Sequence, residues 1–179
     1  MLRIRYPKKH SLGFHDVSEI TYVGSTNGYA VYFTNDEPSP GLQTYWFHDP
    51  DFTDKQGAMR VVAEMTLRQS KNGVYEVDVI VIDSEYQGLD LAPKMYAYIL
   101  RKLNITLQAG ECQSPGGRSI WRRLSRRKDV LIYGKTPHGK PIMLAEDPIT
   151  AELAPVVPRS NIELYDGYKD FYMYAVRAA

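Results

Sequence analysis

The chain has 179 residues, of which 44% are hydrophobic and 24% charged, and its formal net charge is +1. This length and composition are typical of a single soluble globular domain, and the small net charge argues against a general nucleic-acid or membrane-surface binder. The single cysteine, Cys112, excludes an internal disulfide framework. Because no apolar run is long enough to cross a bilayer and the N-terminus has no signal-peptide core, we expect a cytoplasmic protein without a membrane anchor.

The first half of the chain predicts a meander of strands. Runs rich in β-branched and aromatic residues alternate with turn signals such as Ser25–Gly28 and Lys71–Gly73. The last predicted strand is especially dense in β-branched residues, as buried strands are. In chain order we expect strands at Glu19–Val23, Tyr29–Thr34, Gln43–Phe47, Met59–Arg68 and Val74–Ile82.

The second half predicts two helices and several short strands. Apolar residues recur at helical spacing at Met95, Ile99 and Leu103, and Ser114 followed by Pro115 has the pattern of an N-cap and a first helical residue. Residues 145–161 contain three prolines and predict an extended connection. The expected elements are a helix Ala92–Leu103, a short strand Asn104–Ala109, a helix from Ser114 to about Arg127, strands Val130–Gly134 and Lys140–Leu144, and a final strand or short helix Ile162–Val176, which we place on the sheet.

The junction between the strand Val74–Ile82 and the helix Ala92–Leu103 is the most informative feature. A strand that passes through a tight turn into a helix directs unpaired backbone N–H groups outward, and the helix dipole adds partial positive charge there. Such a place suits a phosphate group. The alternative is an ordinary connection, because short glycine motifs produce many false matches.

The turn Gln87–Ala92 resembles the acetyl-coenzyme A motif of the GCN5-related N-acetyltransferases, Arg/Gln-x-x-Gly-x-Gly/Ala. Gln87 matches its first position and Ala92 its last, and Tyr86 and Gly88 fit the usual entry to the motif. Downstream, Ser119–Leu124 resembles the next helix of that fold. The resemblance implies an α/β fold with a mixed, mostly antiparallel central sheet flanked by helices.

The same resemblance implies a single domain over residues 1–179. Residues 1–70 would form the N-terminal meander and acceptor side, residues 74–127 the acyl-coenzyme A-binding core, and residues 128–179 the C-terminal strands and tail.

The resemblance also implies the activity and the residues that hold the co-substrate. Family members transfer an acetyl or other acyl group from a coenzyme A thioester to an amine by direct attack, without a metal. Main-chain groups of the turn hold the pyrophosphate, and the end of the preceding strand pairs with the pantetheine arm. The residues implied are Ile80, Val81, Ile82, Gln87, Gly88, Leu89, Asp90, Leu91 and Ala92.

Two residues depart from the family pattern. Asp90 replaces the middle glycine of the motif, and a carboxylate there should repel a phosphate unless its side chain turns aside as an N-cap. Trp121 lies where many members carry the tyrosine that protonates the leaving thiolate, and an indole N–H cannot do this. Tyr133 and Tyr96 are the candidates for that role.

The predicted proton acceptors for the attacking amine are Asp78 and Glu64. Asp78 interrupts an apolar strand, and a buried carboxylate is costly without a reason. A hydrogen-bonded structural Asp78 is almost as well supported, and for Glu64 alone we favour solvent-facing polar alternation. His48, next to Trp46 and Phe47, either lines a substrate pocket or is a loop histidine beside core aromatics, and we favour the second. No histidine pair has zinc spacing, so no metal is expected.

A second hypothesis is a catalytically degenerate member of this fold that binds and modulates a protein, as a phage-encoded protein acting in the host cytoplasm would. The fourteen tyrosines and the stripe Arg118, Arg122 and Arg126 would then form the partner-facing surface. For the enzyme, the expected partner is an amine-bearing small molecule or protein. Nucleic acid is disfavoured by the neutral charge.

Overall fold

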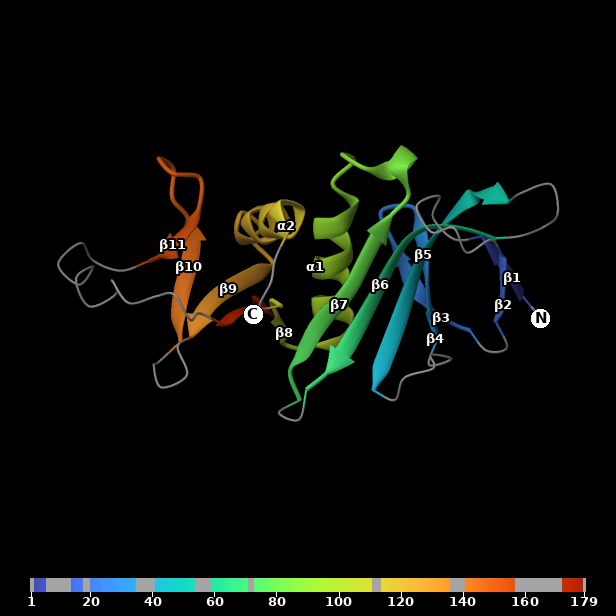
Figure 1. Ribbon diagram of the computed structural model, residues 1–179, viewed down its shortest axis with the longest axis horizontal. Coiled ribbons are helices and arrows are strands. Elements are labelled where there is room, and N and C mark those ends of the chain that lie inside the picture. Colours follow the sequence, from blue (N-terminus) through green and yellow to red (C-terminus); the bar gives the residue numbers. More distant parts are fainter. Residues whose placement is uncertain are drawn as a thin grey trace. The chain divides into compact units, whose positions relative to one another are not determined.

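A computed structural model describes residues 2–5, 14–17, 20–34, 41–53, 59–70, 73–110, 114–135, 141–156 and 172–178. The chain divides into two compact units. One comprises Met1–Ser70 and Val77–Met95, and the other Lys71–Glu76 and Tyr96–Ala179. Strand β7 and helix α1 (Figure 1) therefore each begin in one unit and end in the other.

The first unit is an antiparallel meander. Strands β3, β4, β5 and β6 pair consecutively and antiparallel, and β7 follows β6 in the strand order. The N-terminal pair β1–β2 is antiparallel, and β1 also pairs with β6 in parallel. The bounds are β1 Leu2–Arg5, β2 Phe14–Val17, β3 Thr21–Thr26, β4 Tyr29–Thr34, β5 Leu42–Thr53, β6 Met59–Gln69 and β7 Tyr75–Ile82.

Local sequence explains how these strands are joined and packed. Asn27 and Gly28 both have positive φ, as the tight β3–β4 hairpin requires. Val31, Phe47 and Met65, on three neighbouring strands, are each 0% exposed, so the core of this unit lies over the middle of the meander. The register shifts on both sides of His48 in β5, which is where the β5–β6 pairing becomes irregular.

Among the described residues, the second unit contains the start of β7, the rest of α1 and six further elements. The start of β7 pairs in parallel with β8, and β8 pairs antiparallel with β12. Strand β12 pairs with β9, β9 with β10 and β10 with β11, all antiparallel. The bounds are α1 Leu91–Leu103, β8 Leu107–Gln108, α2 Pro115–Ser125, β9 Val130–Lys135, β10 Ile142–Glu146, β11 Leu153–Pro155 and β12 Tyr172–Arg177.

The predicted fold class, a mixed and mostly antiparallel sheet with helices, is confirmed. The Ser114 cap is also confirmed, since its Oγ accepts the Gly117 N–H at 3.1 Å and Pro115 is the first helical residue. The expected ladder of long strands is present, and β12 is the expected final strand. The start of its predicted range, residues 162–171, lies outside the described residues.

Several sequence-based expectations were wrong. Strands β1, β2 and β11 were not predicted, because they are short and carry too little hydrophobic periodicity. Strand β7 was expected to be buried, but none of its residues is: Asp78 and Val79 are exposed and the others half-buried.

No helix in the described part of the chain is long and apolar enough to cross a membrane.

Candidate functional site

The end of β7 is fixed by Asp83, which is 1% exposed. Its backbone N–H donates to the Val62 carbonyl at 2.8 Å, which ties it to β6. Its Oδ1 accepts the Glu85 N–H at 3.0 Å and its carbonyl accepts the Tyr86 N–H at 2.9 Å. These bonds cap a short 3₁₀ turn, η1 (Ser84–Tyr86), so Asp83 both ends the strand and starts the turn toward α1.

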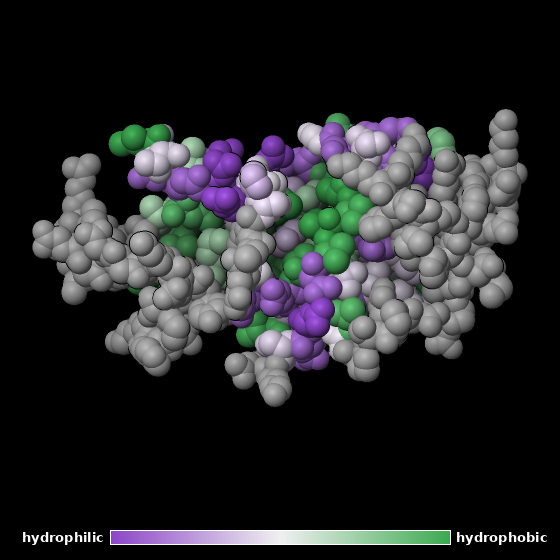
Figure 2. Space-filling model, in the orientation of Figure 1, coloured by the Kyte–Doolittle hydropathy of each residue, from purple (hydrophilic) through white to green (hydrophobic). Residues whose placement is uncertain are grey.

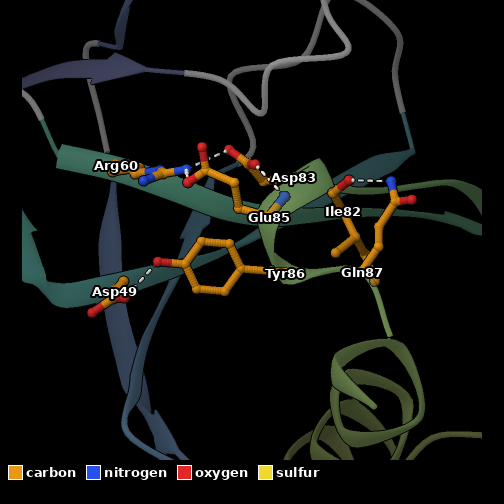
Figure 3. A network of polar contacts seen from close by, with 7 residues as sticks. All are labelled: Asp49, Arg60, Ile82, Asp83, Glu85, Tyr86 and Gln87. Carbon is orange, nitrogen blue, oxygen red and sulfur yellow. Dashed lines mark hydrogen bonds and ion pairs between the residues drawn. The ribbon is translucent and has the colours of Figure 1, made fainter. Parts of the chain in front are cut away.

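The candidate motif forms a turn that is exposed at Gln87–Leu89, whereas Leu91 and Ala92, at the start of α1, are buried. Gly88 has φ +84° and Asp90 has φ +60°, so two residues of this turn are left-handed. The Gln87 side chain folds back, and its Nε2 donates to the Ile82 carbonyl at 3.0 Å (Figure 3). This bond joins the first motif residue to the last residue of β7. Leu89, at the tip, is 56% exposed.

The start of α1 offers donors and positive charge to an anion. The first N–H groups of a helix, here those of Leu91 and Ala92, have no carbonyl partner within the helix. Pro93 has no N–H, and the Lys94 N–H donates to the Asp90 carbonyl at 3.4 Å. The Lys94 ammonium donates to the Leu89 carbonyl at 3.3 Å, so its charge lies beside the turn. Sequence analysis missed Lys94, although a lysine one turn into a helix that follows such a motif is a usable signal.

Asp90 occupies the N-cap position of α1, since it directly precedes the helix and its carbonyl accepts the Lys94 N–H at 3.4 Å. Its backbone is left-handed, whereas N-cap residues are usually extended. The left-handed conformation explains why glycine suits this position of the motif. Aspartate is one of the few other residues that tolerate it.

The β7 residues predicted to face a pantetheine arm lie just before the turn. Ile80, Val81 and Ile82 are half-buried and Val79 is 40% exposed. In Figure 2 the visible surface is hydrophobic where the second half of β7 lies and hydrophilic toward its first half. Within its own unit this segment has β6 as its strand neighbour. The structure therefore places all the residues predicted to hold the co-substrate on one continuous strand–turn–helix segment.

Asp78 is not the buried carboxylate that the sequence predicted. It is exposed, and its Oδ1 accepts from Arg68 Nη2 at 2.7 Å and from Arg68 Nε at 3.1 Å. Arg68 on β6 therefore compensates the charge of Asp78. Because Asp78 is exposed, the cost of burying a carboxylate is no longer a reason to assign it a catalytic role. Its predicted role as a base stays a prediction.

Glu64 is half-buried on β6, and its Oε2 accepts a hydrogen bond from Trp46 Nε1 at 2.9 Å. The two residues are directly paired across β5 and β6. Glu64 is thus held in place by a buried indole, which neither alternative from the sequence anticipated.

The second unit contains both predicted proton donors to the thiolate, Tyr133 and Tyr96. It also contains Trp121, which lies where the family motif has its tyrosine. Tyr133 is half-buried on β9. Trp121 is 2% exposed, and its ring meets that of Tyr96 edge-on at 6.1 Å. Burial strongly raises the pKa of Tyr96. Trp121 is therefore a core residue, and Tyr96 is a poor proton donor.

The arginine stripe on α2 is partly used inside its own unit. Arg122 Nη1 donates to the Ala151 carbonyl at 2.8 Å, and Arg126 Nη2 donates to Glu146 on β10 at 2.6 Å. Arg118 is exposed. A partner surface formed by all three arginines stays a prediction.

A cluster of charged and aromatic side chains joins η1 to β5 and β6 (Figure 3), and sequence analysis did not find it. Arg60 on β6 is 7% exposed, and its Nη2 donates to Asp83 Oδ2 at 3.1 Å and to Glu85 Oε2 at 2.6 Å. The Tyr86 hydroxyl donates to Asp49 Oδ2 at 2.7 Å. Burial, and then the bond to Asp49, raises the pKa of Tyr86 to about 12. These residues come from three separate segments, so no local pattern in the sequence brings them together.

His48 is a buried histidine at the β5 irregularity. It is 7% exposed, and within the described residues no hydrogen bond of ordinary geometry reaches either ring nitrogen, although the Phe52 backbone lies near enough to favour the charged ring. Its ring meets Tyr32 edge-on at 6.3 Å. Burial lowers the pKa of His48, although the charge of Asp49 acts in the opposite direction. The favoured expectation was a loop histidine beside core aromatics: the aromatic surroundings agree with it, but His48 lies within strand β5, so its placement in a loop was wrong.

Within the described residues no group of three or more His, Cys, Asp or Glu side chains is arranged to hold a metal ion.

Comparisons with known proteins give similarity in structure alone. No family model and no curated protein matches the sequence. A candidate acyl-CoA N-acyltransferase of Klebsiella pneumoniae is 14% identical, with 79% of this chain and 76% of that chain covered and a TM-score of 0.40. A GNAT-family acetyltransferase of Staphylococcus aureus is 11% identical, with 76% and 68% covered and a TM-score of 0.36. A nourseothricin acetyltransferase is 14% identical, with 80% and 69% covered and a TM-score of 0.35. At these values the similarities do not assign the chain to a family, and its function has to be argued from its own residues.

Proposed function

We propose that this protein transfers an acyl group from a coenzyme A thioester to an amine. The observation that carries the proposal is the junction of β7, η1 and α1, where the motif Gln87–Ala92 forms a partly left-handed turn at a helix start, exposed at Gln87–Leu89 and buried at Leu91 and Ala92. Backbone N–H groups at Leu91 and Ala92 and the Lys94 ammonium supply donors and positive charge suited to a pyrophosphate. An ideal Cβ built on Gly88 has nothing within 4 Å, so the turn is open on that side.

In the proposed reaction the amine nitrogen attacks the thioester carbonyl carbon, the new C–N bond forms and the C–S bond breaks. The amine loses one proton, and the thiolate gains one as it leaves. Asp78 or Glu64 would accept the proton from the amine, directly or through water, and Tyr133 is the proposed donor to the thiolate. The second half of β7, Ile80–Ile82, would align the pantetheine arm by main-chain pairing.

A second candidate function is supported by Trp121 and Asp90. Trp121 fills the core at the position predicted for an acid, and Asp90 adds negative charge beside the proposed pyrophosphate site. Both favour a protein that keeps the fold but acts by binding a partner. The two functions differ in whether a thioester is consumed.

A test that separates them uses Gly88→Val, with Gly41→Val as the matched control. Both glycines have φ near +85° and open space around an added Cβ, but only Gly88 lies in the motif. A branched side chain is strongly disfavoured in this conformation. The acyltransferase proposal predicts that Gly88→Val weakens acetyl-coenzyme A binding by about tenfold or more, which corresponds to about 1.4 kcal/mol, while Gly41→Val keeps wild-type affinity.

Equal affinity of both variants for acetyl-coenzyme A would show that the motif is not part of the binding site. Binding with no thiol release, tested against a panel of polyamines, aminoglycosides and lysine peptides, would favour the binding protein.

A further inference from the structure

We infer that Arg60 is a positioning residue that holds the motif turn in its ligand-ready shape. The inference rests on the proposed function, because it assigns Arg60 a role in coenzyme A binding without contact to the ligand. Arg60 lies on β6, and the motif begins at Gln87, after η1. What links them is the set of contacts that Arg60 makes with η1.

One nitrogen of Arg60 joins two carboxylates of the η1 segment. Its Nη2 bonds to Asp83 Oδ2 at 3.1 Å and to Glu85 Oε2 at 2.6 Å, and Figure 3 shows both carboxylates directed at the guanidinium. The Asp83 side chain is 2% exposed and that of Glu85 is 51% exposed. The buried Asp83 carboxylate is thereby paired, and the exposed Glu85 side chain is tied down.

Aromatic rings complete this support. The Arg60 Cζ lies 4.6 Å from the centroid of the Phe52 ring and 5.3 Å from that of Tyr86. Both distances are within the range of cation–π attraction. Tyr86 is the last residue of η1, and its hydroxyl bonds to Asp49 on β5. The residue that directly precedes Gln87 is thus held by β5 and β6 together.

The consequence is a turn with few conformations before any ligand binds. Gly88 and Asp90 are left-handed, and a free loop would leave such conformations readily. Holding Asp83, Glu85 and Tyr86 limits that freedom. The ligand therefore does not have to order the turn when it binds, and its affinity is higher than it would be for a flexible turn. We name Arg60, Asp83, Glu85, Tyr86 and Asp49 the η1 brace.

The test compares Arg60→Met with Arg60→Lys in the full chain. A lysine keeps the positive charge beside the two carboxylates but has a shorter side chain and no guanidinium over Phe52 and Tyr86, whereas methionine keeps the apolar stem and leaves Asp83 without its Arg60 partner. Arg68→Met is the matched control, since Arg68 lies on the same strand and forms an ion pair with a carboxylate, Asp78. The readouts are the coenzyme A dissociation constant by calorimetry and hydrogen exchange of peptides that cover residues 83–92.

Arg60→Met is expected to weaken coenzyme A binding about tenfold or more and to accelerate exchange in residues 83–92. Arg60→Lys, which keeps the charge, is expected to restore part of both properties, and Arg68→Met to change neither. A folded Arg60→Met protein with wild-type exchange and affinity would overturn the inference. So would a loss of affinity equal in Arg60→Met and Arg60→Lys with no change in exchange.

If Arg60→Met does not fold, Glu85→Ala and Tyr86→Phe decide, because each removes one brace contact while Arg60 stays paired with Asp83. Faster exchange and weaker binding support the brace, and wild-type values in both variants overturn it. If wild-type protein binds no coenzyme A, the proposed function fails. Hydrogen exchange then decides alone whether Arg60 holds the turn.

Discussion

Replacing Asp90 isolates the effect of one negative charge on the proposed pyrophosphate site. A carboxylate 4–8 Å from a phosphate charge in water costs about 0.5–1 kcal/mol per charge. With two phosphate groups, removing it should strengthen coenzyme A binding by about 1 kcal/mol or more, which is about fivefold. The gain should shrink as salt is added, because exposed charges are screened.

Two substitutions separate charge from backbone geometry. Asp90→Asn removes the charge and keeps a side chain that tolerates left-handed φ, whereas Asp90→Gly also removes the side chain. Asn104→Gly is the control, because Asn104 follows the other end of α1 and has φ +51°. It should leave binding unchanged.

The measurement is calorimetric titration with coenzyme A at low and at high salt. Equal or weaker binding by Asp90→Asn at low salt would refute the placement of the pyrophosphate beside Asp90. Tighter binding by Asp90→Gly alone would mean that backbone freedom, and not charge, limits the site.

Further predictions concern stability. Because burial lowers the pKa of His48 in the folded protein, the unfolded chain binds more protons below pH of about 6.5, and the free energy of unfolding should fall as pH decreases through that range. His48→Phe should flatten this slope in urea unfolding followed at several pH values, and an unchanged slope would contradict the burial argument. Ser114→Ala should lower the free energy of unfolding by about 1 kcal/mol through loss of the bond to the Gly117 N–H, while Ser114→Asp keeps the cap. Equal stability of the two variants in thermal unfolding would show that the cap contributes nothing measurable.

Much of the fold was predictable because its signals are local. The apolar spacing of α1 and the Ser114–Pro115 start of α2 each depend on residues close in the chain, and the structure has both elements. The exposure of β7 was not predictable, because burial depends on what covers a strand and not on its own composition.

The motif turn could be predicted from the sequence, but the contacts that hold it in place could not. Gln87, Gly88 and Ala92 were identified by their resemblance to a known family motif, which a short run of sequence is enough to reveal. Arg60 and Asp49 reach η1 only because β5 and β6 fold alongside it, so their contacts with Asp83 and Tyr86 appear only in three dimensions. The pairing of Asp78 with Arg68 escaped prediction for the same reason.

The most direct test of the central claim is calorimetric titration of the wild-type protein with acetyl-coenzyme A, followed by the same titration of Gly88→Val. Micromolar binding that is lost in Gly88→Val and kept in Gly41→Val is the predicted result. Absence of binding at millimolar acetyl-coenzyme A would contradict the account.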